Sequence, residues 1–158
     1  MVTKIAINGF GRIGRLVLRA LEESKRKDLQ VIAINDLGSS ESNAHLFQYD
    51  SNHGTFDKKI SFTKNAFLIG TKQIKVFSER NPNNLPWKKL GIDVLLECTG
   101  IFTKREDAEK HIAAGAKKVL ISAPASGEDL TVVFGVNHKK LKKNMRVVSN
   151  ASCTTNCL

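Results

Sequence analysis

Residues 4–14 read KIAINGFGRIG, a short apolar run that passes directly into a Gly-x-Gly-x-x-Gly pattern. The run is typical of a buried parallel strand, and the glycines stand where a tight turn would lead into a helix. Beyond the turn, apolar residues recur at helical spacing and predict that one face of a helix packs on the core, with the helix ending near residues 25–28. These residues are Ile13, Leu16, Val17, Ala20 and Leu21.

A second apolar run at residues 29–34 ends at Asn35 and Asp36. Strand, helix and strand within about 35 residues form a βαβ unit, whose connection forces parallel pairing. In this setting the glycine pattern is a dinucleotide-binding fingerprint. Gly9 permits the tight turn, Gly11 lets the backbone approach a pyrophosphate, and Gly14 lets the helix pack closely on the strand. The free N–H groups at the start of the helix then face the phosphates.

The acidic residue expected about 20 residues beyond the glycines is Asp36, whose carboxylate can accept both ribose hydroxyls of an adenosine. A carboxylate repels a 2′-phosphate, and the neighbouring Leu37 offers no positive charge. The sequence therefore favours NAD over NADP, although Arg80 or a lysine could offset this preference.

The rest of the chain alternates in the same way after an irregular middle. We expect a helix at 41–48 capped by Ser39 or Ser40, a loop at 80–87, and a helix at 104–114 stopped by Gly115. Short antiparallel strands are expected at 59–62, 66–69 and 73–77, and parallel strands at 93–97, 118–121, 131–134 and 146–148. The predicted fold is an α/β, Rossmann-type doubly wound sheet, mostly parallel, with a small antiparallel insertion and helices on both faces.

Composition excludes several classes of protein. With 158 residues, 41% hydrophobic and 25% charged, the chain can bury a core, and no run of about 18 apolar residues predicts a membrane span. Three cysteines make no disulfide framework, which favours a reducing, cytoplasmic setting. The net charge of +10 comes from scattered lysine pairs, with only residues 139–143 forming a local cluster. A solvated basic surface is favoured over a nucleic-acid site.

Residues 150–158, NASCTTNCL, predict the start of another helix with Cys153 in its first turn. The partial positive charge of a helix N-terminus favours a thiolate, so Cys153 is a candidate nucleophile, flanked by the hydroxyls of Ser152 and Thr154. A small buried core cysteine is the alternative. Cys153 and Cys157 are spaced as a possible metal pair, but no further cysteine is placed to complete a metal site. No histidine is placed by the sequence to serve as the base for Cys153. Because the sequence stops within this element, we expect a fragment or one domain of a longer polypeptide.

Several motifs together carry a family resemblance over residues 5–158. They are Asn8–Arg15 (NGFGRIGR), Tyr49–Ser51 with His53-Gly54, Glu97–Phe102 (ECTGIF), Ser122–Pro124, Gly135–Asn137 and Ser149–Asn156 (SNASCTTN). The chain resembles the glyceraldehyde-3-phosphate dehydrogenase family of the phosphorylating, glycolytic type. The last motif is highly specific to this enzyme and its close relatives, and raises Cys153 above the buried-cysteine alternative.

The resemblance implies a role for each matching position. Arg12 and Ile13 would offer backbone N–H groups to the NAD pyrophosphate, and Asp36 would hold the adenosine ribose. Arg80 and Phe102 would border the adenine, and Thr99 and Ser122 would lie near the ribose and nicotinamide side. Cys153 would be the nucleophile, and Ser152 and Thr154 would bind substrate or phosphate. Residues 1–150 would be the NAD-binding domain, and residues 151–158 the start of a catalytic domain whose remainder is absent from this sequence.

The implied reaction oxidises glyceraldehyde 3-phosphate with NAD to a thioester on Cys153, from which inorganic phosphate releases 1,3-bisphosphoglycerate. Members of this family are usually homotetramers. The resemblance implies that the histidine that activates the cysteine lies beyond residue 158, so we expect the isolated chain to bind NAD weakly without turnover. Two alternatives stay open. One is erythrose-4-phosphate dehydrogenase, which shares the cofactor domain and nucleophile. The other is a stand-alone, non-catalytic NAD-binding module with a basic surface.

Overall fold

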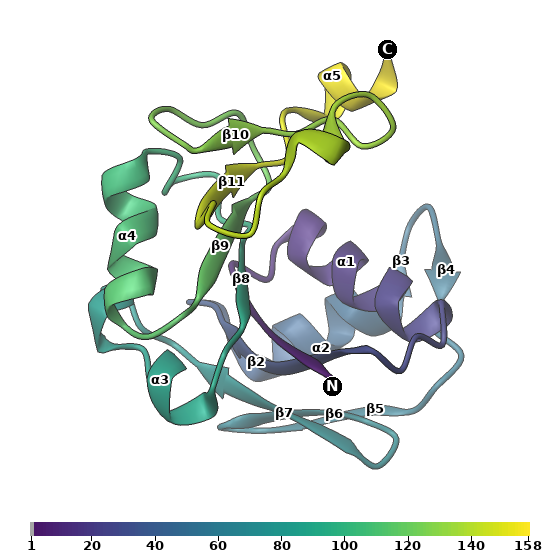
Figure 1. Ribbon diagram of the computed structural model, residues 1–158. Helices are drawn as coiled ribbons and strands as arrows, with labels where there is room; N and C mark the ends of the chain where they lie inside the picture. The colour runs from purple at the N-terminus through teal and green to yellow at the C-terminus, as the bar shows by residue number, and fades with distance from the viewer. Residues whose placement is uncertain (1) are drawn as a thin grey trace.

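The computed structural model describes residues 2–158 as a nine-stranded sheet with helices on both faces, and a separate two-stranded hairpin (Figure 1). The strands are β1 (Thr3–Asn8), β2 (Leu29–Asn35), β3 (Tyr49–Asp50), β4 (Gly54–Thr55), β5 (Ile60–Thr63), β6 (Ala66–Ile69), β7 (Lys72–Phe77), β8 (Val94–Glu97), β9 (Lys118–Ile121), β10 (Leu130–Thr131) and β11 (Val147–Ser149). The helices are α1 (Arg12–Glu23), α2 (Ser40–Gln48), α3 (Trp87–Leu90), α4 (Arg105–Ala113) and α5 (Cys153–Cys157), with short 3-10 turns η1 (Pro82–Asn84) and η2 (His138–Lys140).

The large sheet has the strand order β10-β11-β9-β8-β1-β2-β7-β6-β5. Every neighbouring pair from β10 to β7 is parallel, and β6 is antiparallel to both of its neighbours. The chain therefore leaves β1 in one direction through β2 and later returns to its other side at β8. This confirms the predicted doubly wound sheet with an antiparallel insertion, and puts its topological switch point between β1 and β8.

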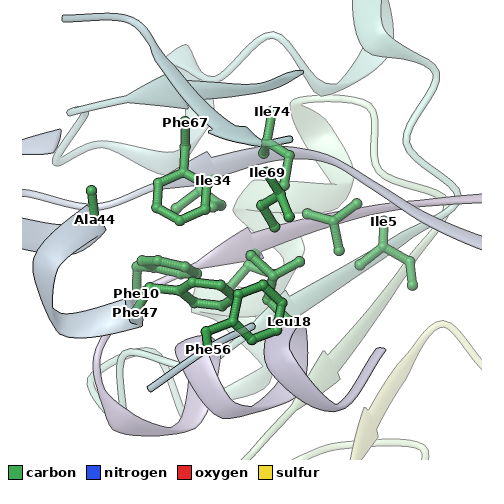
Figure 2. Packing of buried hydrophobic residues seen from close by; sticks show 12 residues of the cluster. Ile5, Phe10, Leu18, Ile34, Ala44, Phe47, Phe56, Phe67, Ile69 and Ile74 are labelled. Carbon is green, nitrogen blue, oxygen red and sulfur yellow. The ribbon is translucent and has the colours of Figure 1, made fainter. Parts of the chain in front are cut away.

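Side chains alternate between two cores, one on each face of the sheet. Under α1 and α2, Phe10, Phe47 and Phe67 pack together with Leu18 and other aliphatic residues (Figure 2). Under α3 and α4, the fully buried Trp87 lies in the second cluster. Since Phe10 belongs to the glycine loop itself, the first core anchors that loop to the body of the domain.

Helix α1 turns a different face to the sheet from the one that apolar spacing predicts. Gly14 and Leu18 are buried, whereas Ile13 and Val17 are 46% and 37% exposed. A Cβ on Gly14 would stand 2.2 Å from the carbonyl oxygen of Gly9, so the helix touches the preceding turn at this residue. That contact sets the rotation of α1. The predicted core-facing stripe was wrong at Ile13 and Val17, whereas Leu21 does pack against the core.

The strand predicted at 131–134 is shorter in the structure, where β10 ends at Thr131. The side chain of Asn137 ends the pairing, because its Oδ1 accepts from the N–H of Val133 at 2.8 Å and its Nδ2 donates to the carbonyl of Thr131 at 3.0 Å. The chain turns away, and Phe134 is exposed.

The segment predicted as a loop at 80–87 contains η1 and the first residue of α3. Asn81 caps the turn by accepting from the N–H of Asn83 at 3.1 Å, and Gly91 ends α3 in the left-handed conformation at φ 65°. Such short elements carry too few residues for a periodic signal. The longer predicted helices agree within about two residues, and Ser39 is the cap of α2. Across residues 2–158, none of the helices has the length and apolar character needed to cross a membrane.

Candidate functional site

A cleft of about 380 Å³ lies at the carboxyl ends of β1, β2 and β8, at the switch point of the sheet. Open parallel sheets bind their ligands at this position. Six of the predicted cofactor residues line it, namely Gly9, Gly11, Asp36, Arg80, Thr99 and Phe102. The lining also includes Asn8, which the sequence places at the strand edge where such sheets bind ligands. Five further lining residues were not selected as cofactor ligands, namely Asn35, Leu37, Glu79, Cys98 and Ile101.

The glycine loop has the shape that a pyrophosphate needs. Gly9 has φ +88°, and a Cβ there would lie 2.7 Å from the backbone nitrogen of Thr99. At Gly11 a Cβ would meet no atom within 4 Å, so the space beside it is open. The first N–H groups of α1 have no acceptor within the helix. Open space beside a glycine and unpaired helix N–H groups together fit a bound dinucleotide.

Asp36 is already engaged by the protein. Its Oδ2 accepts from the N–H of Phe10 at 2.7 Å, and its Oδ1 accepts from the N–H of Gly38 at 2.8 Å and from Nδ2 of Asn43 at 3.2 Å. A carboxylate offers about four acceptor positions, of which these donors use three. One position is left for the two expected ribose hydroxyls, so both can bind Asp36 only if one of these donors is displaced.

Three predicted cofactor residues lie outside the cleft lining. Arg12 and Ile13 begin α1 with exposed side chains, and Nη1 of Arg12 pairs with Asp50 at 3.2 Å. Only their backbone is therefore suited to a phosphate. Ser122 follows β9, and its backbone N–H donates to the carbonyl of Glu97 at 2.9 Å.

Cys98 also lines the cleft. Burial raises the pKa of its thiol to about 11, a hydrogen bond with Ser122 opposes the rise, and the neighbouring Glu97 carboxylate adds to it. A thiol with this pKa stays protonated at neutral pH, so Cys98 is not a nucleophile there.

Cys153 has the opposite environment. It is exposed at the first turn of α5, where the Oγ of Ser152 caps the helix by accepting from the N–H of Thr155 at 3.0 Å. Thr154 is also exposed. The alternative of a buried core cysteine is therefore wrong for Cys153 in this chain. Immediately before the cap, buried Ala151 has the left-handed φ of 57°, which turns the chain sharply from β11 into α5.

The segment that carries Cys153 does not line the cleft, but follows the carboxyl end of β11 on the same sheet. Figure 1 shows α5 at the C-terminal end of the chain, beyond β11. Nδ2 of Asn156 ties the segment down by donating to the carbonyls of Asn150 at 2.8 Å and Ser152 at 2.9 Å. Within residues 2–158, no group of three or more His, Cys, Asp or Glu side chains is arranged to hold a metal ion.

Fold, switch point and glycine loop together define a dinucleotide-binding domain of the Rossmann class. Residues 3–105 match the family described as glyceraldehyde 3-phosphate dehydrogenase, NAD binding domain. The chain belongs to this family, and NAD is the cofactor that the family's domain binds.

Relatives extend the likeness over the whole chain. The chain is 61% identical to the glyceraldehyde-3-phosphate dehydrogenase of Xanthobacter flavus over 158 residues, covering 100% of this chain and 47% of the relative. It is 57% identical to the enzyme of the same name from Pseudomonas aeruginosa over 159 residues, which cover 100% of this chain and 48% of the relative. It is 53% identical to the enzyme of the same name from Thermotoga maritima over 157 residues, which cover 99% of this chain and 47% of the relative. The chain spans about half the length of the curated relatives it matches.

Proposed function

We propose that this chain is the cofactor-binding half of an NAD-dependent, phosphorylating glyceraldehyde-3-phosphate dehydrogenase. Residues 1–150 form its NAD-binding domain and residues 151–158 begin its catalytic domain. The observation that carries the proposal is an exposed cysteine, Cys153, in the first turn of a helix that follows a strand of the same sheet as the dinucleotide cleft. The names of the relatives support the same activity for the complete protein.

In this proposal the cofactor residues divide the dinucleotide between them. The backbone around Gly9 and Gly11 and the first N–H groups of α1, at Arg12 and Ile13, hold the pyrophosphate. Asp36 holds the adenosine ribose, Arg80 and Phe102 border the adenine, and Thr99 and Ser122 lie toward the second ribose and the nicotinamide. Exposed Leu37 beside Asp36 offers no partner for a 2′-phosphate, which supports NAD over NADP.

The proposed chemistry belongs to Cys153. Its thiolate Sγ attacks the aldehyde carbon of glyceraldehyde 3-phosphate, and the carbonyl oxygen becomes an oxyanion for which the Cys153 N–H is a candidate donor. Bound NAD supplies the hydride acceptor that oxidises this adduct to a thioester. Inorganic phosphate then attacks the thioester carbon and releases 1,3-bisphosphoglycerate, and the electron pair of the broken C–S bond returns to Sγ. Ser152 and Thr154 offer hydroxyls to substrate or phosphate.

The test uses the complete polypeptide that carries this chain, with NADH absorbance as the readout. Turnover requires aldehyde, NAD and phosphate together, and Cys153→Ser lowers kcat by roughly 10⁴-fold because the nucleophile is lost. Cys157→Ser, one helical turn further on, is the matched control and keeps turnover. Equal activity of the two variants would refute the assignment. We expect no turnover from the isolated 158-residue chain, and turnover by it that depends on Cys153 would contradict the proposal.

Two further parts of the proposal have their own tests. A higher kcat/KM for the tetrose phosphate than for the triose phosphate would favour erythrose-4-phosphate dehydrogenase instead. We also propose that the complete protein is a cytoplasmic homotetramer, which sedimentation and cell fractionation test. If the native polypeptide proved to be only 158 residues long, a stand-alone NAD-binding module would replace the enzyme.

A further inference from the structure

Three polar side chains form one row at the carboxyl edge of the sheet. Asn8, Asn35 and Glu97 end β1, β2 and β8, and Asn8 is the direct cross-strand partner of both others. All three are buried. Nδ2 of Asn35 donates to Oδ1 of Asn8 at 2.7 Å, and Nδ2 of Asn8 donates to Oε2 of Glu97 at 2.6 Å. The row is thus a continuous chain of hydrogen bonds across three strands.

One end of the row holds a segment that borders the cleft on the β2 side. The Asn35 side chain clamps the backbone of Glu79, accepting from its N–H at 2.9 Å and donating to its carbonyl at 2.9 Å. Glu79 and the following Arg80 both line the cleft. The proposed border of the adenine is therefore fixed through Asn35.

The other end of the row holds the segment on the β8 side. Oε1 of Glu97 accepts from the backbone N–H of Thr99 at 2.8 Å and from its hydroxyl, and that hydroxyl oxygen accepts from the N–H of Ile101 at 3.1 Å. Phe102, which follows Ile101, lines the cleft. The two segments that carry the adenine-bordering residues are thus tied to each other through the row, with β1 between them.

Trp87 and His111 form a second chain of hydrogen bonds that ends on Glu97. Nε1 of Trp87 donates to Nδ1 of His111 at 3.1 Å, and Nε2 of His111 lies 3.1 Å from Oε2 of Glu97. Because an indole N–H can only donate, Nδ1 carries no proton, and the hydrogen-bond pattern assigns the proton to Nε2. His111 therefore donates to Glu97. With Asn8 and the two groups of Thr99, four donors surround this carboxylate, so both of its oxygens accept hydrogen bonds from the protein.

We propose that the row Asn35–Asn8–Glu97 is a positioning device that sets the separation of the two segments bordering the adenosine part of NAD, with Glu97 as its main positioning residue. The oxygens of Glu97 are already satisfied by protein donors, so it acts through Thr99 rather than on the cofactor. The inference rests on NAD binding by the cleft and is independent of the chemistry at Cys153.

The test is Glu97→Gln in the complete protein. An amide has one acceptor oxygen where the carboxylate has two, so donors on one side of residue 97 meet an NH₂ group and lose their acceptor. We expect the affinity for NAD and for ADP-ribose, which lacks the nicotinamide, to fall by about tenfold each. We also expect faster amide hydrogen exchange at residues 79–81 and 99–102 in the ligand-free protein.

Asp93→Asn is the matched control. Asp93 immediately precedes β8, at the opposite end of the strand, where its carboxylate accepts from the N–H of Lys4 at 2.9 Å and from Lys117 at 2.6 Å. The change replaces a carboxylate by an amide as in Glu97→Gln, but at the other end of β8 and without touching the cleft. We expect ADP-ribose affinity within twofold of the wild type. An equal loss in both variants would mean general destabilisation and would overturn the proposal.

The remaining outcomes separate this inference from the assignment of the cofactor. A folded Glu97→Gln protein with unchanged ADP-ribose affinity and unchanged exchange would refute the device. Failure of the wild type to bind NAD would refute the cofactor site, while the exchange experiment would still test the row. If Glu97→Gln does not fold, Asn35→Ala carries the test. It must speed exchange at residues 99–102, at the far end of the row, and unchanged exchange there would refute the coupling.

Discussion

Gly14→Ala tests the packing that sets the rotation of α1. The new Cβ would lie 2.2 Å from the Gly9 carbonyl oxygen and 3.0 Å from Cγ2 of Ile7. Cβ atoms need at least 3.0 Å, so the helix must move by about 0.8 Å. Alanine improves helix propensity by about 1 kcal/mol, whereas overpacking costs about 1–3 kcal/mol. Since the obstacle is backbone and cannot change rotamer, the upper cost applies and the net loss is about 2 kcal/mol.

The assay is guanidinium unfolding at a fixed protein concentration, followed by far-UV circular dichroism. Gly11→Ala is the matched control, because its Cβ meets no atom within 4 Å and its φ of −69° suits alanine. We expect this control to keep its stability within about 0.5 kcal/mol. Its NAD affinity falls, since the methyl group occupies the open space beside the loop. A Gly14→Ala protein as stable as the wild type would refute the packing argument.

Three further predictions concern single side chains. Arg105 and backbone N–H groups hold the pKa of Asp129 at about 2, below its ordinary 3.8. The ionised carboxylate therefore stabilises the fold above pH 3.8, and this stabilisation is lost as the pH falls toward 2. In Asp129→Asn the free energy of unfolding should fall less steeply over this pH range, and an unchanged pH dependence would contradict the ion pair. Iodoacetamide at about pH 8 should label Cys153 but spare Cys98 in the folded protein, as peptide mass mapping will show, and equal labelling would contradict the raised pKa. Asp36→Ala should weaken NAD binding and also destabilise the fold by about 1–3 kcal/mol, because the N–H groups of Phe10 and Gly38 lose their acceptor; a calorimetric titration and an unfolding curve measure the two effects separately.

The sheet was predictable because short apolar runs mark its strands in the sequence, and the dinucleotide site was predictable because the glycine pattern follows the first of them. Gly9 needs a positive φ and close contact with Thr99, and such requirements leave a mark in the sequence. Apolar spacing alone did not predict the full buried face of α1, since glycine adds nothing to an apolar stripe. The stripe through Ile13 and Val17 conflicts with the separate expectation that Gly14 packs on the strand. A glycine that must touch backbone fixes a helix's rotation more strongly than exposed aliphatic residues do.

The candidate site divides along a similar line. Asp36 and Thr99 follow recognisable strands or motifs, and the sequence selected them. Asn35 and Glu97 were not selected, because their function depends on register with Asn8 across strands, at sequence separations of 27 and 89 residues. The βαβ unit makes β1 and β2 neighbours, but no local pattern gives the register of their ends or places β8 on the other side of β1. The only hint is a buried charge at the end of an apolar strand, which needs partners wherever it lies.

The central place of β1 in the sheet has a consequence for synthesis on the ribosome. Residues 29–77 supply β2 and the antiparallel strands, so one half of the sheet and the phenylalanine cluster around Phe10 can assemble early. The other partner of β1 is β8, which contains Glu97. Before residue 99 has left the exit tunnel, the nascent chain therefore has an unpaired strand edge at β1. It also lacks the residues after β8 that line one side of the cofactor cleft. NAD can stabilise this domain only after roughly its first hundred residues have emerged, so the earliest folding proceeds without help from the ligand.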